Sequence, residues 1–395
     1  MSWLRNILDN LAPNFEKGGK LEKFYPLFEA TDTILFSTDE RTESGPHIRD
    51  SVDIKRVMIL VVISLIPCYV FGVLNIGYQE ALTYGLDTSD WKRNILSGLS
   101  KVIPILAVTF ATGAFWEVLF AIVRRHSISE GFLVTCALIP LTLPATIPLW
   151  QVAVGTTFGI VIGKEIFGGV GMNIFNPALM TRAFLYFTYP VQISGDKVWA
   201  LAPDGYSGAT ALAIPAGELS KNALDLLNKA SFNTVFDFSW MNMFMGWIPG
   251  SIGETNKLII ILSALFLILT GITSWRIMIG SVAGLLFTAF LTNIFAPYSS
   301  NSMLTIPPHY HLVMGSFLFG TVFMATEPVT SAHTETGKLI YGFFIGMLTV
   351  IIRSINPAYP EGIMLAILLM NAFAPLIDYF VVKSNIKKRM LRYAQ

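Results

Sequence analysis

A polar, glycine-rich stretch carries the residues best suited to hold a covalently attached group. It begins just after a proline and reads Asp204-Gly205-Tyr206-Ser207-Gly208-Ala209-Thr210. Its two glycines let the backbone approach a bulky group closely. Asp204 could orient a metal or a basic group of a modifying enzyme, and Thr210 offers a hydroxyl oxygen for esterification. The spacing alone is also compatible with an ordinary surface turn.

Ionisable side chains inside apolar segments form a second set of candidates, because a charge in a bilayer is costly and usually functional. Carboxylate oxygens can replace water around a hard ion such as Na⁺, so Glu117, Glu327 and Asp378 are candidates for a cation path. For Lys164-Glu165 and Arg182 the alternative is a position near the cytoplasmic interface, where they snorkel or pair.

Histidine and cysteine give no indication of a metal centre. His309 and His311 have no cysteine or carboxylate near them in the sequence, so we interpret them as polar anchors. The two cysteines, Cys68 and Cys136, lie in apolar runs and are too few for an iron–sulfur cluster, which needs about four ligands. We therefore assign no metal.

The composition is that of a polytopic membrane protein. Only 13% of the 395 residues are charged and 53% are hydrophobic, and the mean hydropathy is +0.59. A water-soluble surface could not hide this much apolar bulk. The formal net charge of +1 gives no reason to expect a nucleic-acid partner.

We predict an all-α fold of about ten transmembrane helices. Several apolar runs are shorter than the roughly 20 residues that a full crossing needs. We expect such helices to be tilted, extended by polar residues, or broken at mid-depth. The runs cover residues 57–76, 102–123, 131–149, 151–168, 177–190, 257–275, 277–296, 310–326, 338–352 and 362–382.

Lys and Arg predict the orientation, because they favour the cytoplasmic side of short loops. They are concentrated before the first run and after the last, so both termini are expected in the cytoplasm. The long segment between the fifth and sixth runs then faces outward. The expected divisions are a cytoplasmic segment 1–54, a first membrane half 55–190, an outward segment 191–256, a second half 257–382 and a basic tail 383–395.

A faint internal repeat suggests two halves of five spans each. Repeated-half transporters place their sites where Pro/Gly-interrupted segments meet near mid-membrane. The matching features are Trp116, Pro144 and Asn176-Pro177-Ala178 in the first half, and Trp275, Pro328 and Asn356-Pro357-Ala358 in the second.

Residues 204–210 resemble the signal at which a flavin transferase attaches FMN to threonine in the NqrB/RnfD family, the membrane subunits of Na⁺-pumping NADH:quinone oxidoreductases and their Rnf relatives. The resemblance extends over nearly the whole chain. Its other motifs are Arg49-Asp50-Ser51-Val52-Asp53, Phe115-Trp116-Glu117-Val118-Leu119-Phe120, Lys164-Glu165-Ile166-Phe167-Gly168-Gly169, Ile248-Pro249-Gly250-Ser251-Ile252-Gly253-Glu254 and Asn356-Pro357-Ala358-Tyr359-Pro360-Glu361-Gly362.

The resemblance implies an electron-carrying subunit in a bacterial inner membrane. FMN would be joined to Thr210 through its phosphate, a noncovalent riboflavin would lie among the spans, and electrons would pass to ubiquinone with export of Na⁺. The implied partners are the other subunits of the complex, the flavin transferase and membrane lipid. NADH oxidation would belong to another subunit, in agreement with the absence of a G-x-G-x-x-G motif in the sequence.

Candidate sites for the two other ligands follow from the same resemblance. For riboflavin they are Asn173 and Asn176, whose amides could match the donor and acceptor edges of a flavin, and Glu327 as a facing partner. The glycine-rich stretch 168–177 could instead be a tight interhelical turn. For the quinone they are Gly113, Ala114, Phe115, Trp116 and Glu29. Two of these positions depart from commoner family residues, since Ala114 replaces a glycine and Glu327 an aspartate.

Two other functions remain open at this stage. An Rnf-type subunit would carry the same threonyl flavin but serve ferredoxin and NAD, and the long N-terminal segment argues against it. A secondary transporter or channel would carry no flavin. Its aquaporin-like form is disfavoured because the Asn-Pro-Ala copies lie 356 − 176 = 180 residues apart and Tyr359, not arginine, follows the second.

Overall fold

A computed structural model gives the fold of the chain. It describes residues 2–15, 19–25, 28, 29, 32, 36, 54–124, 128, 131–203, 208–219, 222–356 and 359–393. These residues are helical or irregular, and the β-structure among them is one isolated bridge between Leu219 and Asn301.

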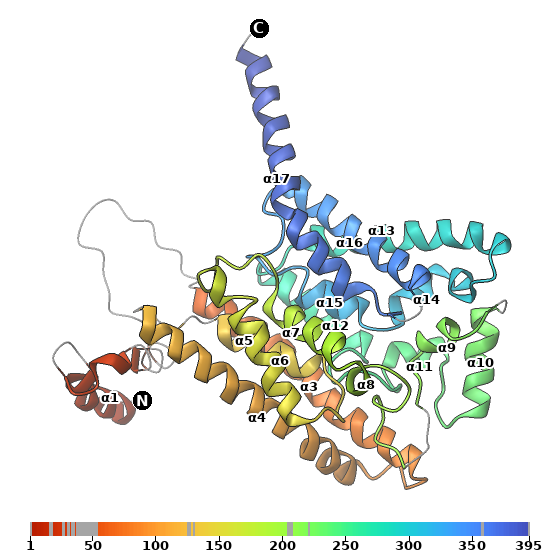
Figure 1. Cartoon of the computed structure of the whole chain (residues 1–395), viewed down its shortest axis with the longest axis horizontal. Coiled ribbons are helices and arrows are strands. Elements are labelled where there is room, and N and C mark those ends of the chain that lie inside the picture. Colours follow the sequence, from red (N-terminus) through yellow and green to blue (C-terminus); the bar gives the residue numbers. More distant parts are fainter. Residues whose placement is uncertain are drawn as a thin grey trace.

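Five helices are long and apolar enough to cross a membrane (Figure 1). This confirms a polytopic, all-helical membrane protein. α17 also continues well past the body of the protein in Figure 1, carrying the basic residues of the tail. The five are α3 (Ile54–Thr83), α4 (Trp91–Arg124), α13 (Trp275–Phe295), α16 (Glu335–Ile355) and α17 (Ile363–Tyr393).

The other predicted runs contain shorter helices. The run predicted at 131–149 is helical only to Leu141, after which a segment with Pro144 and Pro148 leads into the next helix. The run predicted at 310–326 is two helices, because Gly315 between them has φ +65°, a conformation that no α-helix continues. The helices concerned are α5 (Gly131–Leu141), α6 (Leu149–Val161), α7 (Pro177–Thr188), α12 (Lys257–Leu269), α14 (Pro308–Val313) and α15 (Phe317–Phe323).

The helices pack in two similar groups. In the first, α4 packs against α6 and α5 against α7. In the second, α13 packs against α16 and α15 against α17. The groups meet where α3 contacts α12 and where α7 contacts α17. Short helices are thereby enclosed between long ones, so the proline- and glycine-broken segments lie inside the protein.

The contact between α13 and α16 is built on glycines spaced four residues apart. A Cβ on Gly284 or Gly342 would collide with the backbone carbonyl of the facing helix, at Phe343 and Ile277 respectively. Such small-xxx-small spacing lets two membrane helices approach until their backbones touch. Gly280 and Gly346 complete the pattern.

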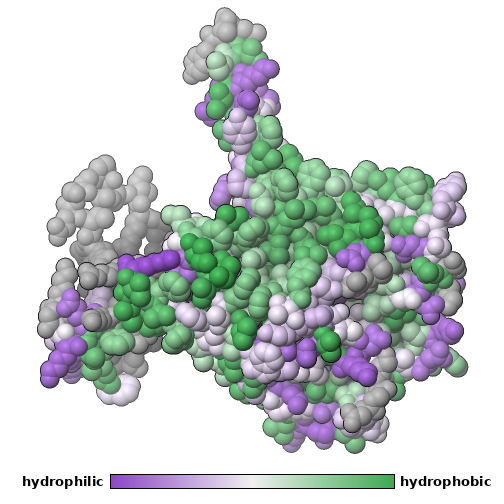
Figure 2. Space-filling view, in the orientation of Figure 1, coloured by the Kyte–Doolittle hydropathy of each residue, from purple (hydrophilic) through white to green (hydrophobic). Residues whose placement is uncertain are grey.

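The remaining elements cover the ends of the bundle. Apolar side chains are exposed over α13, α16 and α17, whereas hydrophilic residues gather around the end that carries α10 (Figure 2). These elements are α1 (Ser2–Phe15), η1 (Glu22–Phe24), η2 (Glu165–Phe167), α8 (Pro190–Ile193), α9 (Ala213–Ala216), α10 (Ala223–Asn233), α11 (Trp240–Met245), η3 (Ala296–Tyr298) and η4 (Ser302–Thr305).

Candidate functional site

Thr210 stands at the start of a helical turn that leads into α9. Its carbonyl accepts a hydrogen bond from the Ala213 backbone N–H at 3.0 Å, and the same N–H lies 3.4 Å from the Thr210 Oγ1. Gly208 is buried and donates its backbone N–H to the Asp196 carbonyl at 2.7 Å. Ala209, between them, is half-buried. Three predicted motif residues lie outside the described residues: Asp204, Gly205 and Ser207.

A cavity of ≈ 200 Å³ lies beside Thr210. One wall comes from α7, another from the irregular segment 193–199, and a third from residues 359–361, just before α17. The lining is partly aromatic and partly charged, which suits a ring system with a polar attachment. The residues that matter most here are Arg182, Tyr186, Trp199, Tyr359 and Glu361.

Buried charged groups lie next to this cavity. Glu361 is 7% exposed, and its carboxylate accepts hydrogen bonds from the Ser316 backbone N–H at 3.0 Å and hydroxyl at 2.7 Å. Arg353 is fully buried and donates to the carbonyls of Glu361, His311 and Met314 at 2.8–3.0 Å. The guanidinium therefore satisfies carbonyls that the ends of short helices would otherwise leave unpaired.

Lys257 likewise satisfies backbone carbonyls at the neighbouring helix break. Its ammonium group donates to the Glu254 carbonyl at 2.5 Å and to the Gly315 carbonyl at 2.8 Å. One carboxylate oxygen of Glu254 accepts from the Ser251 backbone N–H at 3.0 Å, and the other, Oε2, has no hydrogen-bond partner among the described residues. The sequence interpretation did not single out Glu254 and Lys257 as partners. The available signal was that both charged residues flank an apolar run.

The structure brings together the three riboflavin candidates. The Thr330 hydroxyl donates a hydrogen bond to the Glu327 carboxylate at 2.9 Å, and the side-chain amides of Asn173 and Asn176 lie close to the same carboxyl group. All three candidates line a second cavity, of ≈ 60 Å³, together with apolar residues of α3, α5 and α15. The predicted facing of residues 168–177 and Glu327 is thus confirmed as a contact.

Local sequence explains how the two amides reach this cavity. Gly168, Gly169 and Gly171 all have positive φ, between +91° and +122°, so the chain reverses tightly after α6. Asn176 then caps α7, its Oδ1 accepting the Leu179 backbone N–H at 3.1 Å. Pro177 occupies the first helical position, where no N–H is needed.

Glu117 does not face an open path but a buried lysine. It forms an ion pair with Lys164, and both side chains are at most 3% exposed. Lys164 also lies 3.2 Å from Glu165, which pairs with Arg124 at 3.3 Å. The paired alternative for Lys164-Glu165 is therefore confirmed.

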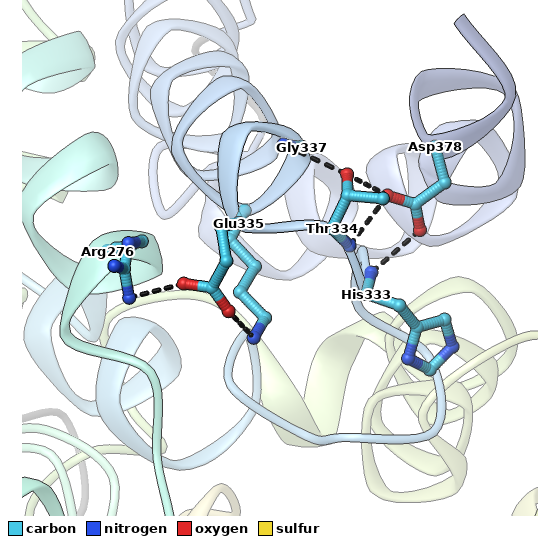
Figure 3. A network of polar contacts seen from close by, with 7 residues as sticks. Arg276, His333, Thr334, Glu335, Gly337 and Asp378 are labelled. Carbon is cyan, nitrogen blue, oxygen red and sulfur yellow. Dashed lines mark hydrogen bonds and ion pairs between the residues drawn. The ribbon is translucent and has the colours of Figure 1, made fainter. Parts of the chain in front are cut away.

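Asp378 ties α17 to the start of α16 (Figure 3). Its carboxylate accepts the backbone N–H of His333 at 2.7 Å and of Thr334 at 2.9 Å, and the Thr334 hydroxyl at 2.5 Å. Thr334 in turn caps α16 by accepting the Gly337 N–H at 3.1 Å. Nearby in Figure 3, Glu335 pairs with Arg276.

The quinone candidates of α4 do not share one face. Gly113 is buried, and a Cβ there would lie 2.9 Å from the Phe132 ring. Phe115 is 61% exposed, since residues two apart project from opposite sides of a helix. Trp116 is anchored by donating its indole N–H to the Thr157 hydroxyl at 2.9 Å. Ala114 is half-buried, as is Glu29 in the N-terminal segment.

Arg182 lines the same cavity as Thr210. It lies in the middle of α7. Among the described residues, no group of three or more His, Cys, Asp or Glu is arranged to hold a metal ion.

The fold and cavities define an all-helical membrane protein with enclosed polar sites at broken helices. The chain belongs to the NQR2, RnfD, RnfE family, whose model matches residues 41–387. It is 51% identical to the B subunit of the Na(+)-translocating NADH-quinone reductase of Chromohalobacter salexigens, covering 99% of this chain and 97% of that protein. The corresponding protein of Pseudomonas paraeruginosa is 44% identical and that of Ectopseudomonas mendocina 46%, each over 98% of this chain and 99% of the relative.

Proposed function

We propose that the chain is the NqrB subunit of a Na⁺-translocating NADH-quinone reductase and carries electrons through flavin towards ubiquinone. The single observation that carries this is the complete 204–210 flavinylation motif, with Thr210 lining a cavity, in a chain that relatives of that name match from end to end. It would work within the hetero-oligomeric complex, so it is a part of the enzyme and not the whole.

The residues around Thr210 fit an FMN group joined through its phosphate. The cavity offers aromatic walls from Tyr186, Trp199 and Tyr359 and a buried cation, Arg182. When bound, the flavin supplies the redox chemistry, and the protein sets its position and electrostatics. The aromatic walls exclude water from one side of the group, and the hydrogen bonds of Gly208 and Thr210 hold the attachment point in place.

The cavity of Asn173, Asn176 and Glu327 fits the polar edge of a riboflavin. Its amides are both donors and acceptors, and its remaining walls are mostly apolar, with Lys164 and three threonines as further polar groups. The longer side chain of Glu327, compared with the aspartate of other family members, already reaches both amides. We therefore propose that the three residues orient the riboflavin ring among the membrane helices.

The membrane arrangement that we propose has ten spans in two halves, with both termini in the cytoplasm of a bacterial inner membrane. It is supported by the similar packing of α4–α7 and α13–α17. Glu117, Glu327 and Asp378 remain candidates for the Na⁺ path, and Gly113, Ala114, Phe115, Trp116 and Glu29 for the quinone site. With this arrangement we also propose that the chain divides into residues 1–54, 55–190, 191–256, 257–382 and 383–395.

The test compares the wild-type chain with Thr210→Ala after coexpression with a flavin transferase. We expect the wild type to gain the mass of FMN less water and to fluoresce in denaturing gels, and the variant to show neither. An unmodified wild type, with the transferase shown to be active on a control substrate, would return the chain to the transporter alternative. A quinone-reduction assay of the assembled complex distinguishes this subunit from an Rnf-type one.

A further inference from the structure

Arg182 is a buried cation without a hydrogen-bond partner in the described part of the chain. It is 7% exposed, and it makes no hydrogen bond or close ion pair with those residues. It lines the cavity that also holds Thr210. A guanidinium whose N–H donors meet no acceptor among these residues is available to bind an anion in the cavity that it lines. Arg353 shows the contrast, since protein carbonyls satisfy its guanidinium.

The buried charged groups next to the cavity contain one cation more than anions. Arg182, Lys257 and Arg353 lie within electrostatic range of two carboxylates, Glu254 and Glu361. Three cations against two anions leave 3 − 2 = +1 among the described residues of this cluster. Because buried charges persist only when they are balanced, a ligand with one permanent negative charge would make the cluster neutral.

We propose that Arg182 binds the phosphate of the group carried by Thr210. This rests on the proposed flavinylation and assigns the residue that recognises the phosphodiester. Once esterified to the threonyl oxygen, the phosphate keeps one ionised oxygen in every redox state of the flavin. A flavin ring, by contrast, becomes anionic only when reduced. The permanent charge deficit therefore favours the phosphate, and a planar guanidinium can donate two parallel hydrogen bonds to its oxygens.

The direct test uses the assembled complex with Thr210→Ala, which cannot be flavinylated, and titrates it with free FMN and free riboflavin. These probes differ only by the phosphate. We expect the added FMN to bind more tightly than the added riboflavin. Arg182→Gln should weaken the affinity for FMN by about tenfold or more and leave the affinity for riboflavin unchanged. Arg182→Lys should retain part of the preference. Arg93→Gln should retain all of it, because Arg93 is a half-buried arginine of α4 that does not line this cavity.

A second measurement keeps Thr210. The initial rate of flavinylation at limiting flavin donor should fall about tenfold in Arg182→Gln and recover in part in Arg182→Lys. Equal loss of FMN and riboflavin in the titration would assign Arg182 to the ring and overturn the phosphate role. The phosphate role would also be overturned if the Thr210→Ala complex showed no preference for FMN, or if Arg182→Gln kept the wild-type flavinylation rate. If the wild-type chain itself carries no FMN, the proposed function fails before this inference is reached.

Discussion

Replacing Lys164 by methionine tests the buried ion pair with Glu117. The substitution keeps an unbranched side chain of similar length and removes only the ammonium group. Glu117 and Lys164 are 2% and 3% exposed, so water cannot take the place of the lost partner. Glu165 is 1% exposed but keeps Arg124 at 3.3 Å, so the uncompensated charge falls mainly on Glu117.

The magnitude follows from the burial of that charge. Removing one partner of a buried ion pair typically costs about 3–5 kcal/mol, because the other charge stays desolvated. We expect Lys164→Met to lower the free energy of unfolding by that amount. The double variant Glu117→Leu with Lys164→Met removes both charges, and replacing a whole buried pair by apolar residues is often neutral. It should therefore be more stable than Lys164→Met alone.

The assay is SDS-induced unfolding of the purified protein in mixed micelles. Lys338→Met is the matched control, because the side chains of Lys338 and Glu335 are 23% and 58% exposed and such a solvent-accessible pair contributes only about 0–1 kcal/mol. If Lys164→Met is as stable as the wild type, or if the double variant is the less stable of the two, Glu117 is not held as a buried ion pair. That result would favour Glu117 over Glu327 and Asp378 as a group of the cation path.

Three further predictions concern packing and capping, each measured by the same unfolding assay. Gly346→Leu should lower the free energy of unfolding by about 1–3 kcal/mol or more, because the new side chain would collide with the backbone of α13 at Ser281. The control Ile279→Leu, on the exposed side of α13, should leave the stability unchanged. Equal stability of the two variants would contradict the close helix contact. Arg353→Gln should lower the free energy of unfolding by about 1–3 kcal/mol or more, because the buried carbonyls of His311 and Met314 lose their donor, and a fully stable variant would mean that these hydrogen bonds are dispensable. Asp378→Ala should lower the free energy of unfolding by about 1–3 kcal/mol, since two backbone N–H groups lose their acceptor. Asp378→Asn should lower it by less, because the amide keeps one acceptor oxygen. The reverse order would show that the charge of Asp378, and not its capping, matters there.

The class of protein could be predicted from the sequence. A scarcity of charge over 395 residues leaves no soluble fold that could hide the apolar surface. Each predicted apolar run contains helix, because helices satisfy their own backbone groups in lipid. The motif that ends at Thr210 was also readable, since it is a short local pattern. The facing of Asn173 and Asn176 towards Glu327 joins segments far apart in the sequence, and only the internal repeat and the family resemblance suggested it.

The partners of the buried charges were decided only by the tertiary structure. Hydropathy marks Glu117 and Arg182 alike as costly charges, yet one pairs with Lys164 and the other lies beside Thr210 without a close ion pair among the described residues. Lys257 and Glu361 flank apolar runs and resemble interfacial residues in the sequence, but they are buried where broken helices meet. Which carbonyl or carboxylate meets a cation depends on contacts between distant segments, and the period of one helix carries no information about them.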